Sequence, residues 1–292
     1  MEEKKEATFD IFPEPLELLN LSYVEQCNTI MVLQNKPQFN QWSQCVLDMA
    51  DQEMNQGKYQ SSTNLLMLLR KTSVEEIKNI CDIKLGKLAY EEKKYIAAFT
   101  AFDSVRQRTY KDLNLVPSDI YFWLAKIQAE LGQYFEAKEY IRMAAHRGHN
   151  LVELLTLSMQ IAQLEHSPGK ERLFAAIMEM VSQNSDVTFN LNTYKEELKK
   201  FCLSNADQEL LDLDESPELA LRNIKKMITV NRPSAVLYGL GGVAYYELGL
   251  YKNAWLFWCK GIEYEPYIPA MERAAINLGS HYICSYIEEL LS

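Results

Sequence analysis

The chain has 292 residues, 48 % of them hydrophobic, so it is long enough to bury a sizeable core. Its formal net charge of −10 at pH 7 argues against a nucleic-acid backbone or an anionic membrane surface as the main partner, and is compatible with a basic peptide or protein. The six cysteines form no C-x-x-C pair, the charged opening MEEKKEATFD lacks a signal peptide's apolar core, and no run approaches the ~18 apolar residues of a membrane span. We therefore expect reduced thiols in an intracellular protein, cytoplasmic or nuclear, with no membrane insertion.

Residues 1–15 are rich in charge and end in Pro13-Glu14-Pro15. This composition predicts a disordered or extended lead-in. Phe9, Ile11 and Phe12 form an apolar patch inside it that a plain linker does not need. Two interpretations stay open: a tail that packs loosely, or a short segment that docks on the protein itself or on a partner.

The next part of the chain predicts three helices, separated by Asn35-Lys36-Pro37 and by a turn at Gly57. Four leucines within five positions indicate that the third helix is heavily buried. The expected helices cover residues 16–33, 38–55 and 58–71. The second and third form a weak helical pair around Ala50, Gly57 and Tyr59.

Two clearer pairs follow, in which small and aromatic residues alternate at helical spacing. Lys93 stands at the turn of the first pair, where the second has Gly132, and Gly148 is the expected C-cap of the second. The patterned positions are Leu85, Gly86, Tyr95, Ala98, Phe102 and Val105 in the first pair, and Tyr121, Leu124, Ala125, Tyr134, Ala137, Ile141 and Ala144 in the second.

The middle of the chain is more degenerate, although its length leaves room for two divergent hairpins. An acidic stretch around residues 207–215 joins the last two of its expected helices. These helices cover residues 151–165, 170–182, 191–203 and 217–230.

Residues 234–266 carry the strongest pattern, two short helices around Gly249 that Pro266 terminates. Gly239, Gly241 and Gly242 lie within the first of them. Because each glycine costs about 1 kcal/mol in a helix interior relative to alanine, the cluster predicts a very close helix–helix approach. A further helix over residues 270–291 is expected to cover the last apolar face.

This recurring pattern resembles the tetratricopeptide repeat (TPR), a helix–turn–helix unit of about 34 residues. In residues 234–266, Gly242, Tyr245, Gly249, Tyr251, Ala254, Trp258 and Pro266 fit it, while Tyr238 and Gly241 replace the usual Trp and Leu. The resemblance implies an all-α solenoid of about five or six hairpins in a right-handed superhelix with a C-terminal capping helix. The expected organisation is a lead-in at 1–15, TPR-like repeats at 16–148, degenerate repeats at 149–233, and a last repeat with its cap at 234–292.

The resemblance also implies a non-catalytic scaffold that binds a protein or peptide in its concave groove, or acts as a subunit of a multiprotein complex. The alternative is a peptide- or client-binding chaperone or regulator of the same type. The two-carboxylate clamp of chaperone-binding relatives needs Lys and Asn one turn apart. The matching positions carry Leu47 and Asp51, Ile83 and Lys87, Phe122 and Lys126, and Gly239 and Val243, so such a clamp is not expected.

No residue pattern predicts catalysis, direct nucleic-acid binding or a cofactor. The glycine cluster lies inside a helix, whereas a dinucleotide fingerprint needs a strand before it. His146 and His149 are too few to hold a structural metal and fit helix-end residues better. We therefore expect no enzyme activity, no metal and no cofactor.

Five residues are candidates for partner binding. In tetratricopeptide repeats the inner face of each repeat's first helix lines the groove. The aromatic candidates on such first helices are Phe122, Trp123 and Tyr246, and Lys126 follows Phe122 by one turn. Gly239 offers a smooth backbone patch. For the three aromatic residues, a place in the core or on ordinary surface stays open as the alternative.

Overall fold

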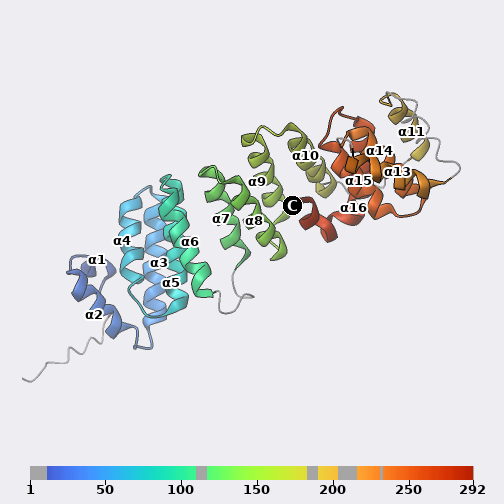
Figure 1. Cartoon of the computed structure of the whole chain (residues 1–292). Helices are drawn as coiled ribbons and strands as arrows, with labels where there is room; N and C mark the ends of the chain where they lie inside the picture. Colours follow the sequence, from blue (N-terminus) through green and yellow to red (C-terminus); the bar gives the residue numbers. More distant parts are fainter. Residues whose placement is uncertain (1–11, 110–116, 183–189, 203–215, 231–232, 292) are drawn as a thin grey trace, which may run out of the picture. The chain divides into compact units, whose positions relative to one another are not determined.

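A computed structural model describes residues 12–109, 117–182, 190–202, 216–230 and 233–291 of the chain (Figure 1). Every regular element in these ranges is a helix, so the expected all-α class is confirmed for them. The helices are α1 (Pro15–Leu18), α2 (Tyr23–Leu33), α3 (Phe39–Asn55), α4 (Tyr59–Leu69), α5 (Glu75–Glu91), α6 (Tyr95–Thr109), α7 (Ser118–Glu130), α8 (Tyr134–His146), α9 (Leu151–Leu164), α10 (Pro168–Ser182), α11 (Leu191–Lys199), α13 (Pro217–Val230), α14 (Ala235–Glu247), α15 (Tyr251–Ile262) and α16 (Pro269–Leu291).

The chain forms two compact units, Met1–Gly132 and Gln133–Ser292. Both of the later boundaries expected from the sequence, at 148 and at 233, fall inside the second unit. The acidic stretch 207–215, Phe9 and Ile11 lie outside the described residues.

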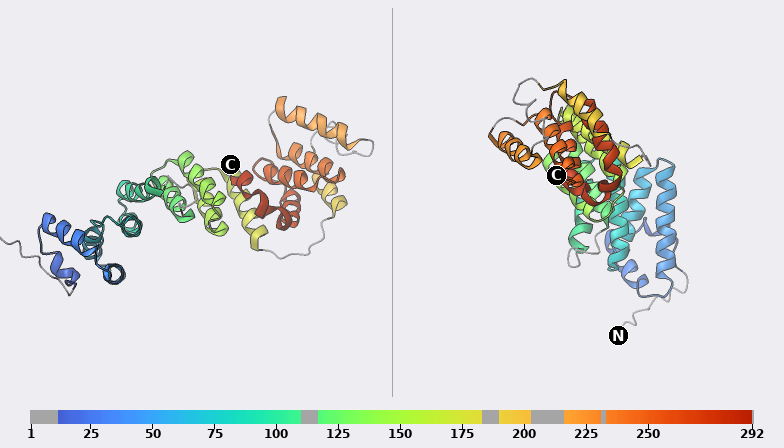
Figure 2. Two further views of the ribbon diagram at one scale, coloured as in Figure 1. Left: turned by 90° about the horizontal axis from the view of Figure 1, so that it is seen from below. Right: turned by 90° about the vertical axis from the view of Figure 1, so that its right-hand side faces the viewer.

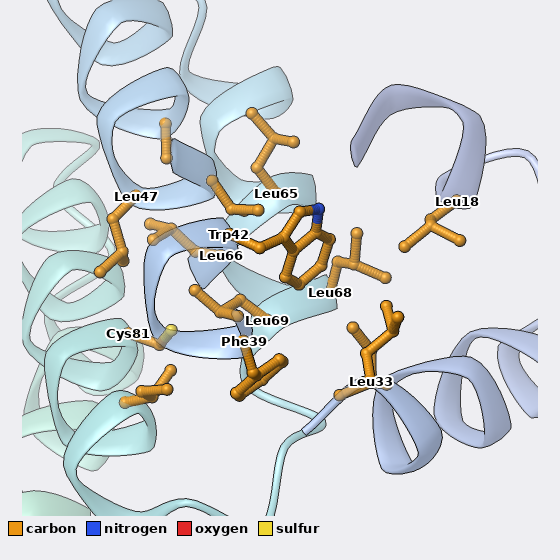
Figure 3. Close-up of a cluster of buried hydrophobic side chains, with 14 of the residues drawn as sticks. Leu18, Leu33, Phe39, Trp42, Leu47, Leu65, Leu66, Leu68, Leu69 and Cys81 are labelled. Carbon is orange, nitrogen blue, oxygen red and sulfur yellow. The ribbon is translucent and has the colours of Figure 1, made fainter. Parts of the chain in front are cut away.

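In the first unit each helix from α3 onward packs on the next: α3 on α4, α4 on α5, α5 on α6 and α6 on α7, while the short α1 packs on α4 (Figure 2). This order follows from the short loops, because helices joined by a few residues become antiparallel neighbours. The core at its N-terminal end comes from α1 to α5 (Figure 3). Its labelled members are Leu18, Leu33, Phe39, Trp42, Leu47, Leu65, Leu66, Leu68, Leu69 and Cys81.

The segment before α1 packs on this core. The Phe12 ring lies 6.0 Å from the Trp42 ring, and Trp42 Nε1 donates a hydrogen bond to the Pro13 carbonyl over 3.0 Å. Of the apolar patch in the lead-in, Phe12 therefore docks on the protein itself.

One backbone geometry recurs at the turns. A residue with φ between 54° and 75° ends the first helix, and the next helix begins two residues later. At the α14–α15 turn, Gly249 N donates to Tyr246 O and Leu250 N to Tyr245 O, the paired bonds of a Schellman motif. The turn residues with this spacing are Gly57, Lys93, Gly132, His166 and Gly249, while Gly148, also with positive φ, precedes α9 by three residues.

The second unit is not a simple succession of neighbours. Its adjacent pairs α8–α9, α9–α10, α13–α14, α14–α15 and α15–α16 pack together, but α16 also packs on α8, α10 and α11. In the view of Figure 1, α16 runs below α10 and α15, and it packs on both of them. A Cβ atom at Gly279 would overlap the Met180 side chain, so the glycine permits the close approach of α16 to α10. The C-terminal helix thus does more than cover the last hairpin.

Candidate functional site

Four aromatic rings from α5, α6 and α7 form a cluster in the first unit. Trp123 stacks on the buried Phe102 with centroids 5.5 Å apart and planes inclined by 5°. Tyr90 meets Trp123 edge-on at 5.4 Å and Tyr95 at 5.5 Å. Gly86 makes room for this arrangement, because a Cβ atom there would lie 2.7 Å from the Phe102 ring. The cluster fixes the orientation of Trp123 from its buried side.

Two lysines lie over the outward side of these rings. Lys126 Nζ is 4.6 Å from the Trp123 centroid, 4.9 Å from that of Tyr90 and 5.9 Å from that of Phe122. Lys87 Nζ is 5.6 Å from the Trp123 centroid. Within the part of the chain that the structure describes, neither lysine forms an ion pair. An ammonium group over an aromatic face gains about 0.5–1 kcal/mol at an exposed site, less than a close carboxylate would supply when desolvated.

An acidic residue of α7, Glu130, binds two tyrosine hydroxyls of the same cluster. Glu130 accepts hydrogen bonds from the hydroxyls of Tyr90 and Tyr95, both over 3.2 Å. Burial and then the charge of Glu130 raise the pKa of Tyr90, and burial and the hydrogen bond to Glu130 raise the pKa of Tyr95. Both hydroxyls therefore stay protonated at neutral pH and keep donating to Glu130.

We call Lys87, Tyr90, Phe122, Trp123 and Lys126 the lysine–aromatic surface. Lys87 is exposed and the other four are half-buried. The surface thus offers two ammonium groups above apolar rings whose positions are set from below. Such a combination holds a carboxylate and an apolar side chain at once, and contains no nucleophile paired with a base.

Three of the five residues predicted from the sequence, Phe122, Trp123 and Lys126, are therefore brought together. Sequence reasoning missed Lys87 and Tyr90 as members of the same surface. From the sequence, Lys87 enters only as a clamp position and Tyr90 is not singled out for binding. Their spacing of three residues on one helix places them on one face, which was the available indication.

Gly239 lies in the second unit, buried in α14 beneath α11. A Cβ atom there would lie 2.9 Å from Leu198 Cδ1 and 3.2 Å from the Tyr194 hydroxyl. Its carbonyl accepts hydrogen bonds from Tyr194 Oη over 3.5 Å and from Trp258 Nε1 over 3.4 Å. The backbone at Gly239, which we predicted from the sequence to be a contact site for a partner, thus contacts α11 and α15 of the chain itself.

Tyr246, also on α14, is half-buried. Its ring lies 4.8 Å from Tyr251 and 6.0 Å from Trp258, the residue that also contacts Gly239. Burial, and then Tyr251, raise the pKa of Tyr246. Gly239 and Tyr246 therefore share a neighbour within the second unit, and Tyr246 has one partly open side.

Of the two helix-end histidines, His149 lies beside an acidic residue of the following helix. His149 Nε2 lies 2.8 Å from Glu153 Oε2, one turn along α9. Among the described residues no three His, Cys, Asp or Glu side chains come together as metal ligands do.

None of the helices in the described ranges has both the length and the apolar composition to cross a bilayer. A scan against protein-family models found no match, and searches of curated proteins and of solved structures found no similar chain.

Proposed function

We propose that this chain is a non-catalytic protein-binding scaffold of the TPR-like type, acting in a cytoplasmic or nuclear complex. The observation that carries the proposal is the lysine–aromatic surface. Lys87 and Lys126 lie over the same half-buried Trp123 with no carboxylate partner in the described part of the chain. A partner segment with an acidic side chain beside an apolar one would match both components.

The energetics favour a few strong contacts at this place. Tryptophan and tyrosine are, with arginine, the residues that most often dominate protein–protein binding energies. Trp123 is already oriented by Phe102, so little side-chain entropy is lost when a partner covers it. A partner carboxylate would form charge-assisted hydrogen bonds with the lysines while apolar contact excludes water.

The repeated helix pairs support the solenoid part of the proposal. The same turn recurs between Gly57 and Gly249: a residue with left-handed backbone conformation is followed two positions later by the start of the next helix. Each helix pair has an apolar face that a neighbour must bury, which is the logic of repeat proteins. A right-handed superhelix with a concave groove is the architecture that we propose for these pairs.

The test is affinity purification of the tagged full-length chain from its native cell, with quantitative mass spectrometry. Lys126→Glu should lose the partners that the unmodified chain recovers, because a carboxylate would then repel the partner's own. Lys199→Glu is the matched control, since Lys199 is an exposed lysine that pairs with Glu196 on its own helix over 2.9 Å.

Recovery of the same proteins with both variants would contradict the assignment of this surface. A stoichiometric assembly lost with Lys126→Glu would favour a complex subunit. A single substoichiometric client lost in the same way would favour the client-binding alternative.

A further inference from the structure

A cleft in the first unit, which we call the α4–α6 cleft, opens where α4 and α6 both lie on α5. Its volume is about 390 Å³, at the lower end of the range for binding pockets. Thr63, Met67 and Arg70 line it from α4, at a spacing that places them on one helix face. Leu85 and Leu88 of α5 form part of its apolar floor. None of these residues belongs to the lysine–aromatic surface.

The cleft exists because the α6 side is built from small residues. Ala97, Ala101 and Ser104 recur at helical spacing along that wall, so α6 leaves a gap beside α4. Met67 remains 45 % exposed on the opposite wall. The space between α4 and α6 can therefore accept a side chain from another molecule, because no side chain of either helix fills it.

One end of the cleft adjoins a charge cluster with one excess positive charge, formed by the lining residues Arg70 and Asp82 together with Arg108 behind them. Arg70 Nε lies 2.5 Å from Asp82 Oδ1, and Arg108 pairs with the other oxygen of the same carboxylate. Asp82 is 1 % exposed, whereas the Arg70 side chain is 40 % exposed. Two guanidinium groups thus share one buried carboxylate, which leaves one charge uncompensated. At the opposite end Glu92 and Lys94 neutralise each other at 3.1 Å.

We propose that the α4–α6 cleft docks an amphipathic helical segment of a partner protein. The segment inserts one large apolar side chain between Met67 and Ala101 and places a carboxylate against Arg70. Because Met67 and Arg70 are three residues apart on α4, the acid and the anchor of the segment are three or four residues apart as well. This surface is independent of the lysine–aromatic surface and does not rest on it.

The shape of the cleft favours a polypeptide over a small molecule. Ala97, Thr100 and Glu92 at its edge are exposed, so the cleft is open along its length. A small ligand in a binding site has most of its surface buried, about 70–90 %, which an open cleft cannot provide. A helix, in contrast, can place one side chain in the cleft and cover its open edge with the rest of the helix, which removes the apolar lining of the cleft from water.

The experiment is a selection of 16-residue helical peptides from a display library on the full-length chain, followed by fluorescence anisotropy with each enriched peptide. We expect the enriched peptides to share a large apolar residue and an Asp or Glu three or four positions away. Ala97→Leu and Ala101→Leu, which fill the cleft, should each weaken binding by about tenfold or more. Arg70→Gln should weaken it to a similar extent, and Lys126→Glu should leave it unchanged.

Two controls keep the test sharp. Arg142→Gln removes an exposed arginine of α8 with an ion pair to Glu139, and should not change peptide binding. For Arg70→Gln, thermal melting separates a loss of binding from a loss of folding. Ala97→Leu replaces an exposed residue, so that part of the test does not disturb the ion pairs of Asp82 with Arg70 and Arg108. An empty selection, peptides without the acid, or binding that survives both leucine variants would overturn the proposal. Binding that Lys126→Glu abolishes would overturn it too, because it would place the peptides on the lysine–aromatic surface.

Discussion

Lys93 occupies a position that suits glycine. Its φ is 59°, in the left-handed region that costs an L-residue roughly 1–2 kcal/mol, and it closes the α5–α6 turn where the α3–α4 turn has Gly57. The backbone bonds at the two turns match, because Lys93 N donates to Tyr90 O as Gly57 N does to Met54 O. The turn geometry therefore imposes the strain on Lys93.

We predict that Lys93→Gly stabilises the protein by about 1 kcal/mol, since glycine adopts this conformation without a Cβ clash. Urea unfolding followed by circular dichroism measures the change. Ala97→Gly, at an exposed position inside α6, should cost about 1 kcal/mol instead. Equal losses at the two positions would mean that the α5–α6 turn does not have this backbone conformation in solution.

The glycine cluster shows how far single residues could be interpreted from the sequence. The predicted close approach is confirmed: Cβ atoms at Gly241 and Gly242 would overlap the Phe257 and Trp258 side chains of α15. Those contacts lie within one hairpin, so spacing along the chain was enough to predict them. The contact of Gly239 with α11 could not be foreseen, because nothing in the α14 sequence specifies which distant helix lies there.

At the scale of helices, the same distinction holds. Helix periodicity placed Phe122, Trp123 and Lys126 on one segment, and that part of the candidate site was predictable. Which rings complete it depends on how α5 and α6 pack beside α7, since Tyr90 and Phe102 approach Trp123 through tertiary contacts. The charge cluster of Asp82 was missed for the same reason, because its two arginines come from different helical segments.

Neighbouring residues of α7 should differ in their roles. Phe122 is half-buried and lies 5.9 Å below Lys126 Nζ, whereas Trp123 stacks on the buried Phe102. We predict that Phe122→Ala weakens partner binding while lowering the melting temperature by no more than about 2–4 °C, the shift expected from about 1 kcal/mol in a chain of this size.

Trp123→Ala is the matched comparison, and it should lower the melting temperature by clearly more, because it removes a ring from a packed stack. Differential scanning calorimetry and the partner pull-down read the two effects separately. A large loss of stability for Phe122→Ala would identify it as a core residue and remove it from the surface.

At the scale of the whole chain, the two units differ in how far sequence order determines their packing. In the first, the helices from α3 onward pack mainly on their sequence neighbours, so a repeat pattern predicts most of these contacts. In the second, α16 contacts α8 and α10, which precede it by about a hundred residues. The apolar face of α16 indicated that it covers something, but an apolar face carries no information about which helix it covers.

This difference predicts which helices lose protection from hydrogen exchange when a substitution disturbs the packing of α16. Gly279 of α16 faces Met180 of α10, and a Cβ atom at Gly279 would lie 2.5 Å from Met180 Cγ. Gly279→Val should therefore push α16 away from α10 and raise amide hydrogen exchange in both helices, as well as in α8 and α15, which also pack on α16. The amides of α3 to α6, which pack mainly on helices of the first unit, should keep their exchange rates. Hydrogen exchange with mass spectrometry on the full chain resolves these segments. If only α15 and α16 exchanged faster, α16 would be a simple cap on its sequence neighbour, and its contacts with α8 and α10 would contribute little to the stability of the second unit.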